Sequence, residues 1–175
     1  MNGKLEQIAG TWRLRFVREL AHAPEQVWRA LTEPQQLRAW FPQEIEGEWE
    51  VGAPLRFRSK YGEFDGEVLA CEPPALLEFS WGPDRLRFEL APARDGEACT
   101  LTLLDTLEEL GKAARDGAGW HVCLDALEDS LAGRAPAADS SARWKQVHPG
   151  YVEDFGPEAS AIGPPEAVAA DGYES

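Results

Sequence analysis

Six short apolar runs between residues 45 and 107 limit this chain to a fold built mainly from an antiparallel sheet. They span Ile45–Trp49, Leu55–Ser59, Phe64–Cys71, Leu76–Trp81, Leu86–Leu90 and Cys99–Leu107. The separators between them, such as Pro73-Pro74 and Asp95-Gly96, favour tight turns because proline lacks a backbone donor and glycine adopts positive φ. Apolar and polar residues alternate in the fourth and fifth runs, which predicts a sheet with one buried and one solvated face.

One more strand and two short helices are predicted before these runs. Every second residue of Trp12–Leu20 is apolar except Arg18, which is the period of a strand. Pro24 and Pro34 each suit the first position of a helix, because their missing N–H would have no partner there anyway. We therefore expect a short helix after each proline, the second of which ends at Pro42.

A long amphipathic helix is predicted from Leu110 to Leu131, with Gly133 as its C-terminal cap. Its apolar and small side chains recur every three or four residues, at Ala113, Gly117, Trp120, Leu124, Leu127 and Leu131. Such a helix spans roughly 30 Å, enough to cross the concave side of a curved sheet. We expect His121 and Asp125 on the opposite, exposed face; alternatively they share a hydrogen bond that orients the imidazole.

Length and charge bound the class of protein. The 175 residues suit one domain plus a tail, and a net charge of −14 disfavours nucleic acid and anionic lipid as partners. No signal-like N-terminus and no window of roughly 18 apolar residues occur, so we expect a cytoplasmic protein without membrane insertion. Three cysteines without CxxC spacing, scattered histidines and the absence of nucleotide motifs predict reduced thiols, no metal and no cofactor.

The composition changes after Arg134 and divides the chain. We predict a folded domain over residues 12–134, a linker and aromatic docking segment over 135–155, and a disordered acidic tail over 156–175. The docking segment carries its aromatic residues at helical spacing: Trp144, His148, Tyr151 and Phe155. Because Pro149-Gly150 interrupts this spacing, we expect only one or two short turns there.

Five short segments resemble one branch of the START-like, or SRPBCC, superfamily: the bacterial domains related to the C-terminal part of the heat-shock-protein-90 ATPase activator. They are Ala23–Thr32, Trp40-Phe41, Gly66–Pro74, Phe79–Trp81 and Gly119–His121 followed by Leu124 and Leu127. The resemblance implies an α+β helix-grip fold, in which a curved antiparallel sheet of about seven strands surrounds a long C-terminal helix. It implies little about function, because similar proteins include ligand carriers, cyclases and co-chaperones. Asp105 stands near a position where the family often has histidine.

Arg18 and Asp105 are charged residues within otherwise apolar strand faces. In the fold that the resemblance implies, the first and last strands are neighbours, so the two side chains could meet on the concave face. A buried ion pair adds little net stability, and one inside a cavity suggests ligand recognition. We therefore expect Arg18 to orient a carbonyl or carboxylate of a ligand; alternatively, the pair reaches water at a strand end.

The aromatic residues either fill a core or line a pocket, and their pattern alone does not separate the two. With Arg18, Asp105 and Gly117, they form the predicted ligand site: Trp40, Phe41, Phe57, Phe79, Trp81, Phe88 and Trp120. Gly66 and Gly117 remove side-chain volume where helix and sheet approach, which favours a cavity; alternatively, they permit close packing.

We therefore predict that a small, mostly apolar molecule binds in a cavity between the sheet and the long helix. One alternative is a cyclase or hydratase for an aromatic or polyketide-like substrate, with Asp65, Glu67, Glu89 or Asp105 transferring a proton. A second alternative is a co-chaperone that presents the outer face of the sheet to a chaperone partner. Two copies could also form a homodimer through the aromatic surface of residues 144–155.

Overall fold

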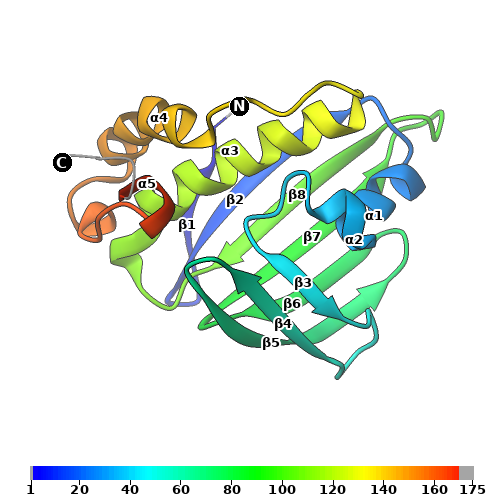
Figure 1. The fold of residues 1–175 in the computed structure, drawn as a ribbon, viewed down its shortest axis with the longest axis horizontal. Coiled ribbons are helices and arrows are strands. Elements are labelled where there is room, and N and C mark those ends of the chain that lie inside the picture. The colour runs from blue at the N-terminus through cyan, green and yellow to red at the C-terminus, as the bar shows by residue number, and fades with distance from the viewer. Residues whose placement is uncertain (1, 170–175) are drawn as a thin grey trace.

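One antiparallel sheet of eight strands curves around a long helix in the computed structural model, which describes residues 2–169 (Figure 1). The strands are β1 (Lys4–Ile8), β2 (Thr11–Leu20), β3 (Glu44–Gly47), β4 (Pro54–Ser59), β5 (Gly62–Glu72), β6 (Leu76–Trp81), β7 (Asp84–Pro92) and β8 (Cys99–Thr106). Their order across the sheet is β1-β2-β8-β7-β6-β5-β4-β3, so β3 to β8 form the predicted meander and β2 closes onto the last strand. The helix-grip prediction is confirmed.

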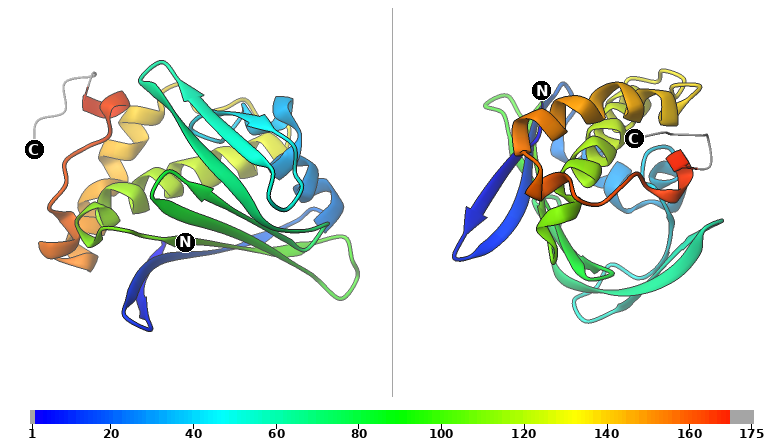
Figure 2. Two further views of the ribbon diagram at one scale, coloured as in Figure 1. Left: turned by 90° about the horizontal axis from the view of Figure 1, so that it is seen from below. Right: turned by 90° about the vertical axis from the view of Figure 1, so that its left-hand side faces the viewer.

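The helices lie on the concave side of this sheet. Two short helices, α1 (Pro24–Thr32) and α2 (Pro34–Leu37), connect β2 to β3, and each begins at its predicted proline. The long helix α3 (Ala113–Leu131) follows a 3₁₀ turn, η1 (Leu110–Lys112). The chain then forms α4 (Ser140–Phe155), the 3₁₀ turn η2 (Glu158–Ser160) and α5 (Glu166–Ala169). Figure 2 shows α4 stacked on α3, while β3, β4 and β5 curve away from it.

The core lies between α3 and the central strands. Phe16 of β2, Phe88 of β7 and Leu103 of β8 point inward and are at most 1% exposed, because alternate residues of these strands face the helix. The predicted stripe of α3 meets them with Leu124 and Leu127, which are fully buried. Burying one such leucine contributes about 1.5–3 kcal/mol, so the stripe fixes α3 across the sheet.

The strand β1 was not predicted. It pairs antiparallel with β2 through a tight turn at Ala9 and Gly10, whose φ angles are +49° and +81°. Such positive φ angles are typical of a two-residue hairpin. The strand is five residues long and mostly exposed, so its apolar pattern is weak.

The predicted break at Pro149 is wrong, because α4 runs without interruption from Ser140 to Phe155. The cost of a proline inside a helix, about 3 kcal/mol or more, is offset by packing against α3. Trp144 and Tyr151, which flank the proline, are 3% and 1% exposed. At its N-terminus the Asp139 carboxylate accepts a hydrogen bond from the backbone N–H of Ala142, which caps the helix.

The structure also differs from the disordered tail predicted for residues 156–175. Ala159 and Val168 are buried, and the N–H of Ile162 donates a 3.0 Å hydrogen bond to the carbonyl oxygen of Gly111. Residues 156–169 are therefore packed on the domain, and the rest of the predicted tail lies outside the described residues. Within residues 2–169 no helix is long and apolar enough to cross a membrane.

Candidate functional site

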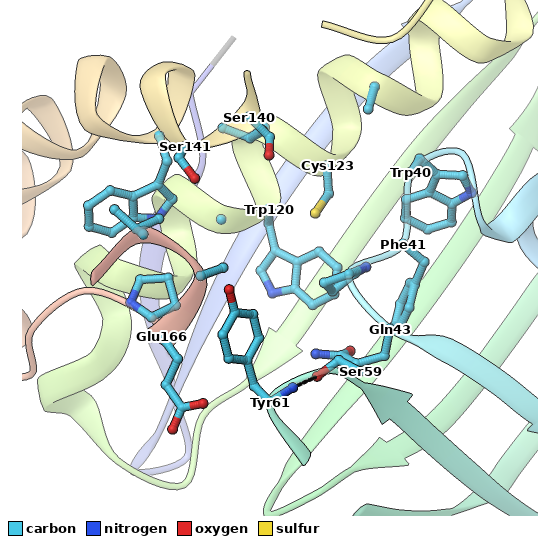
Figure 3. Close-up of a pocket in the computed structure, with 18 of the residues that line it drawn as sticks. Trp40, Phe41, Gln43, Ser59, Tyr61, Trp120, Cys123, Ser140, Ser141 and Glu166 are labelled. Atoms are coloured by element: carbon cyan, nitrogen blue, oxygen red, sulfur yellow. Dashed lines mark hydrogen bonds between the residues drawn. The ribbon is translucent and has the colours of Figure 1, made fainter. Parts of the chain in front are cut away.

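A pocket of about 1230 Å³ opens between α3 and the outer half of the sheet (Figure 3). Residues 59–64 of the β4–β5 hairpin and residues 38–43 after α2 form one side. Residues 115–129 of α3 form another, and residues 136–144 and 165–168 close the remaining side. The pocket arises because β4 and β5 curve away from α3, while the central strands pack tightly against it.

Three aromatic side chains form a continuous apolar wall. The ring centroids of Trp81 and Trp120 lie 5.1 Å apart, and Phe41 lies 5.8 Å from Trp120 and 6.4 Å from Trp81. The indole N–H of Trp81 donates a 2.9 Å hydrogen bond to Oε1 of Gln43, which fixes the plane of this ring. Aromatic faces held in this way suit a flat, apolar molecule.

Trp120 is anchored from below by Asp105. Its indole Nε1–H donates a 2.8 Å hydrogen bond to Oδ2 of Asp105, which is fully buried. Burial raises the pKa of Asp105 well above its ordinary value, and the neighbouring Asp116 and Asp84 raise it further. The carboxyl group therefore favours its neutral form, which can accept from the indole without an unpaired charge in the core.

A few polar groups surround the apolar wall (Figure 3). The Tyr61 ring projects from the hairpin over the pocket, Ser140 and Ser141 lie at the start of α4, and Glu166 lies on α5. Cys123 lies on the α3 side, where burial raises the pKa of its thiol to about 12. This thiol is therefore protonated near pH 7 and is a poor nucleophile.

Four of the ten predicted site residues line this pocket: Trp40, Phe41, Trp81 and Trp120. Phe57, Phe79 and Phe88 instead form the packed core beneath it, with exposed fractions of at most 1%. Phe79 stacks between the other two, at centroid distances of 5.8 and 6.1 Å. One aromatic cluster thus forms both regions: its deeper rings belong to the core, and its outer rings form the wall of the pocket.

The predicted pair between Arg18 and Asp105 is wrong. Arg18 forms ion pairs with Asp125 at 3.0 Å and Glu128 at 2.9 Å, both on α3, and it does not line the pocket. Asp105 lies opposite Leu14 in the sheet, four residues along β2 from Arg18. Both charges do point inward, but α3 supplies a separate partner for each, so Arg18 lies outside the pocket described above.

The predicted role of Gly117 is also wrong. A Cβ atom there would lie 3.0 Å from Cδ1 of Tyr151, so the glycine admits α4 and does not enlarge the cavity. A Cβ atom on Gly66 would collide with the carbonyl oxygen of Ser80 and would lie 2.7 Å from the Phe57 ring. Both glycines therefore permit close packing, which was the alternative interpretation.

The face of α3 that carries His121 is covered by α4 and is not exposed. His121 is 6% exposed, and its Nδ1 lies 2.9 Å from the hydroxyl of Tyr151. That hydroxyl accepts a 2.9 Å hydrogen bond from the backbone N–H of Gly3, so its own proton is directed to the imidazole. Burial lowers the pKa of His121, although the nearby Asp125 opposes the shift.

The same packing uses the aromatic surface that we expected to support a homodimer. Trp144, His148 and Tyr151 are buried against the domain. The Trp144 indole N–H donates a 3.2 Å hydrogen bond to the carbonyl oxygen of Arg115 on α3. Residues 144–155 therefore stabilise the domain itself, and of their aromatic side chains only Phe155 is partly exposed.

Other side chains with chemical potential lie away from the pocket. Asp65, Glu67 and Glu89, three of the carboxylates considered for proton transfer, are absent from its lining. Asp84, Asp105 and Asp116 form the one group among residues 2–169 whose side chains have the spacing of a metal site. Of these, only Asp116 borders the pocket.

Several pocket residues were missed in the sequence. Gln43 and Tyr61 lie in turns, and Ser140 and Glu166 lie in the segments predicted to be a linker and a tail. Cys123 lies on the predicted long helix, outside its apolar stripe. One signal was present, because Tyr61 is a large aromatic residue in the turn Tyr61-Gly62, where nothing in the strand pattern requires it.

Comparison with known proteins places the chain among similar domains. The model of the family described as activator of Hsp90 ATPase homolog 1-like protein matches residues 21–132. A search of curated proteins gave no match.

Solved structures show the same fold. A conserved protein of unknown function from Enterococcus faecalis is 22% identical, with a TM-score of 0.75 over 87% of this chain and 90% of its own. DynU16, a protein in the dynemicin biosynthetic locus, is 27% identical, with a TM-score of 0.62 over 71% of this chain and 48% of its own. The Aha1 dimer from Colwellia psychrerythraea is 22% identical, with a TM-score of 0.59 over 68% and 95%.

Proposed function

The chain belongs to the family of activator of Hsp90 ATPase homolog 1-like proteins, and we propose that it binds a small, mostly apolar molecule in the pocket between α3 and the β4–β5 hairpin. The observation that carries this proposal is the aromatic wall of Phe41, Trp81 and Trp120 beside about 1230 Å³ of open space. Ligand sites commonly have roughly 300–1,000 Å³ and a mostly apolar lining with a few polar groups. This pocket is somewhat larger than that range, so it has room for a small molecule, and its lining has the same chemistry.

The polar groups restrict how such a molecule would lie. Its flat apolar part would stack on Trp81 and Trp120, where rings already pack at 5.1 Å. A hydroxyl or carbonyl group would face Tyr61 of the hairpin, or Ser140 or Ser141 at the start of α4 (Figure 3). The similarity to DynU16, a protein of a biosynthetic locus, is consistent with a secondary metabolite or its precursor as the class of ligand.

A pocket-filling variant tests this proposal. Ala126 of α3 lines the pocket, so Ala126→Trp places an indole in the space that the ligand would occupy. Native mass spectrometry of the freshly purified protein identifies any co-purified molecule, and titration with the neutral probe N-phenyl-1-naphthylamine measures binding. We expect Ala126→Trp to weaken probe binding at least about tenfold, which is about 1.4 kcal/mol.

Ala93→Trp is the matched control, because Ala93 is exposed in the turn between β7 and β8 and does not line the pocket. This variant adds the same side chain and should bind the probe like the unmodified protein. Equal affinities for both variants, or a probe that does not bind at all, would contradict the proposal.

The family name supports a second candidate function, stimulation of the Hsp90 ATPase. The similarity to the Aha1 dimer is consistent with it, and with self-association of this chain. Measuring the ATPase rate of the chaperone with and without the purified chain tests this function. Stimulation that survives Ala126→Trp would assign the activity to the outer surface and not to the pocket.

A further inference from the structure

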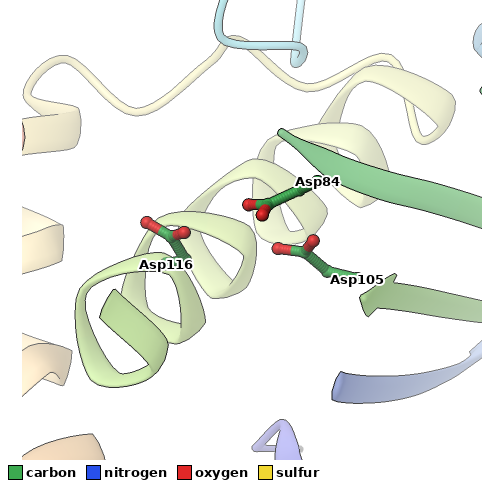
Figure 4. Close-up of side chains that lie close together, drawn as sticks. All are labelled: Asp84, Asp105 and Asp116. Carbon is green, nitrogen blue, oxygen red and sulfur yellow. The ribbon is translucent and has the colours of Figure 1, made fainter. Parts of the chain in front are cut away.

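Three carboxyl groups meet beneath the pocket, where α3 crosses the ends of two strands (Figure 4). Asp84 begins β7, Asp105 lies near the end of β8 and Asp116 lies in the first turn of α3. One oxygen of each lies within 4.8 Å of one oxygen of the other two. Asp84 and Asp105 are 4% and 0% exposed, and the Asp116 side chain is 9% exposed.

The hydrogen bonds of Asp84 are complete. Both of its oxygens lie 2.7 Å from the ammonium nitrogen of Lys112, and Oδ1 also accepts a 2.9 Å hydrogen bond from the backbone N–H of Glu108. Lys112 thus supplies the cation of this cluster. A metal ion at the same place would have to displace a buried ammonium group from its partner, which disfavours a metal site.

Each of the other two carboxyl groups has one bonded and one unbonded oxygen. Oδ2 of Asp105 accepts from the Trp120 indole at 2.8 Å, and Oδ1 of Asp116 accepts from Nε of Arg115 at 2.7 Å. Oδ1 of Asp105 and Oδ2 of Asp116 are buried and have no donor among residues 2–169. A buried acceptor without a donor is costly, so two such atoms in one cluster indicate a missing hydrogen.

The charge of the cluster indicates the same hydrogen. Three ionised carboxylates would face only two cations, Lys112 and Arg115, and would leave one uncompensated negative charge away from water. A single proton removes this charge. Placed on the unbonded Oδ1 of Asp105, it leaves a neutral acid in the most deeply buried position and leaves Asp116 ionised beside Arg115.

We propose that this cluster holds one proton in the folded protein, carried on Oδ1 of Asp105, and that the neutral Asp105 holds Trp120 in the aromatic wall of the pocket. Oδ2 of Asp105 accepts from the Trp120 indole, while Asp84 and Asp116 stay ionised beside Lys112 and Arg115. Trp120 lines the pocket, so Asp105 is a positioning residue for its aromatic wall.

The direction of titration is consistent with this arrangement. Burial raises the pKa of Asp105, and the neighbouring Asp116 and Asp84 raise it further, while the Trp120 hydrogen bond and Lys112 oppose the shift. Burial also raises the pKa of Asp116, but the directly bonded Arg115 opposes that shift, so Asp105 is the group that holds the proton. Removing the proton would bring two buried negative charges together and weaken the attachment of Trp120.

The variant Asp105→Asn tests the proposal, because an amide mimics the protonated acid. Its carbonyl oxygen accepts from Trp120 and its NH₂ group takes the place of the protonated oxygen, with no proton to lose. In the unmodified protein, unfolding above the ordinary Asp pKa of 3.8 releases the proton of Asp105. The unfolding equilibrium constant should therefore rise about tenfold per pH unit from that pH until the folded pKa is reached.

The expected result is that Asp105→Asn lacks this component of the pH dependence, while Asp65→Asn, a change at an exposed carboxylate, retains it. Infrared spectroscopy of the unmodified protein at pH 7 should show a protonated carboxyl band that is absent from Asp105→Asn. The spectrum of the unmodified protein is informative whether or not the variant folds. A spectrum in which all carboxyl groups of the unmodified protein are ionised would overturn the proposal. So would equal pH dependence of the two variants, or a melting temperature that Mg²⁺, Ca²⁺, Mn²⁺ or Zn²⁺ raises in the unmodified protein but not in Asp105→Asn.

Discussion

Removing one hydroxyl group should weaken the attachment of α4 to the domain. Tyr151 is 1% exposed, and its hydroxyl bridges the backbone N–H of Gly3 and Nδ1 of His121, each at 2.9 Å. Tyr151→Phe keeps the ring and its packing but leaves a buried donor and a buried acceptor without a partner. Each such loss costs roughly 1–3 kcal/mol, so we expect a decrease of about 2–6 kcal/mol in the free energy of unfolding.

Urea denaturation followed by circular dichroism measures this change. Tyr61→Phe is the matched control, because Tyr61 is 40% exposed on the hairpin and none of the described hydrogen bonds uses its hydroxyl. A surface change of this kind should stay within about 0.5 kcal/mol. If Tyr151→Phe lost no more stability than Tyr61→Phe, the bridge between α4, α3 and the N-terminus would not exist as described.

The same variant makes a second, independent measurement available. In the unmodified protein the Tyr151 hydroxyl donates to the imidazole, which favours the neutral form of His121. Proton NMR of the imidazole should therefore show a higher pKa for His121 in Tyr151→Phe than in the unmodified protein. An unchanged or lower value would show that the hydroxyl donates elsewhere.

Three further results are expected. Burial lowers the pKa of His121 below 6.5. The neutral imidazole therefore contributes its full share of the free energy of unfolding above pH 6.5, and this share is lost as the pH falls towards the folded pKa. Denaturation at several pH values should show the decrease in stability, and His121→Asn should make the decrease smaller. Gly119→Ala should raise the melting temperature through a helix-propensity gain of about 1 kcal/mol, because a Cβ atom there meets nothing within 4 Å. Gly117→Ala should raise the melting temperature less, or lower it, because its Cβ atom would lie 3.0 Å from Tyr151. Arg18→Met should leave probe affinity unchanged in the titration described for Ala126→Trp, and should cost less than the roughly 3–5 kcal/mol of a fully buried pair, because Asp125 and Glu128 remain partly solvated.

The sheet and its long helix were predictable because their periods are strong. Residues 77–81 and 85–90 alternate between apolar and polar, and the α3 stripe from Ala113 to Leu127 keeps helical spacing, so each pattern has one interpretation. The α4 helix was not predictable in full, since Pro149 disfavours a helix locally and only packing of Trp144 and Tyr151 against α3 overrides it.

The site was predictable only in part, because the sequence pattern does not show how deeply each aromatic side chain is buried. Phe79 and Trp81 are two residues apart on one strand face, yet the first is 1% exposed in the core and the second borders the pocket. Whether a ring is covered depends on where β5 curves away from α3, which is a property of the whole sheet. Likewise, the inward direction of Arg18 followed from strand parity, but its partners Asp125 and Glu128 became evident only with the position of α3.

The segment after Arg134 has a consequence for the limits of the folding unit. The family model ends at residue 132, whereas His121 and Gly117 of α3 are sheltered from water by a helix that begins at Ser140. A chain that ends at residue 132 would expose the imidazole of His121 and the backbone at Gly117, and its pocket would lack one side. Exchange of this segment between relatives should therefore alter the shape of the pocket and the thermal resistance of the domain together.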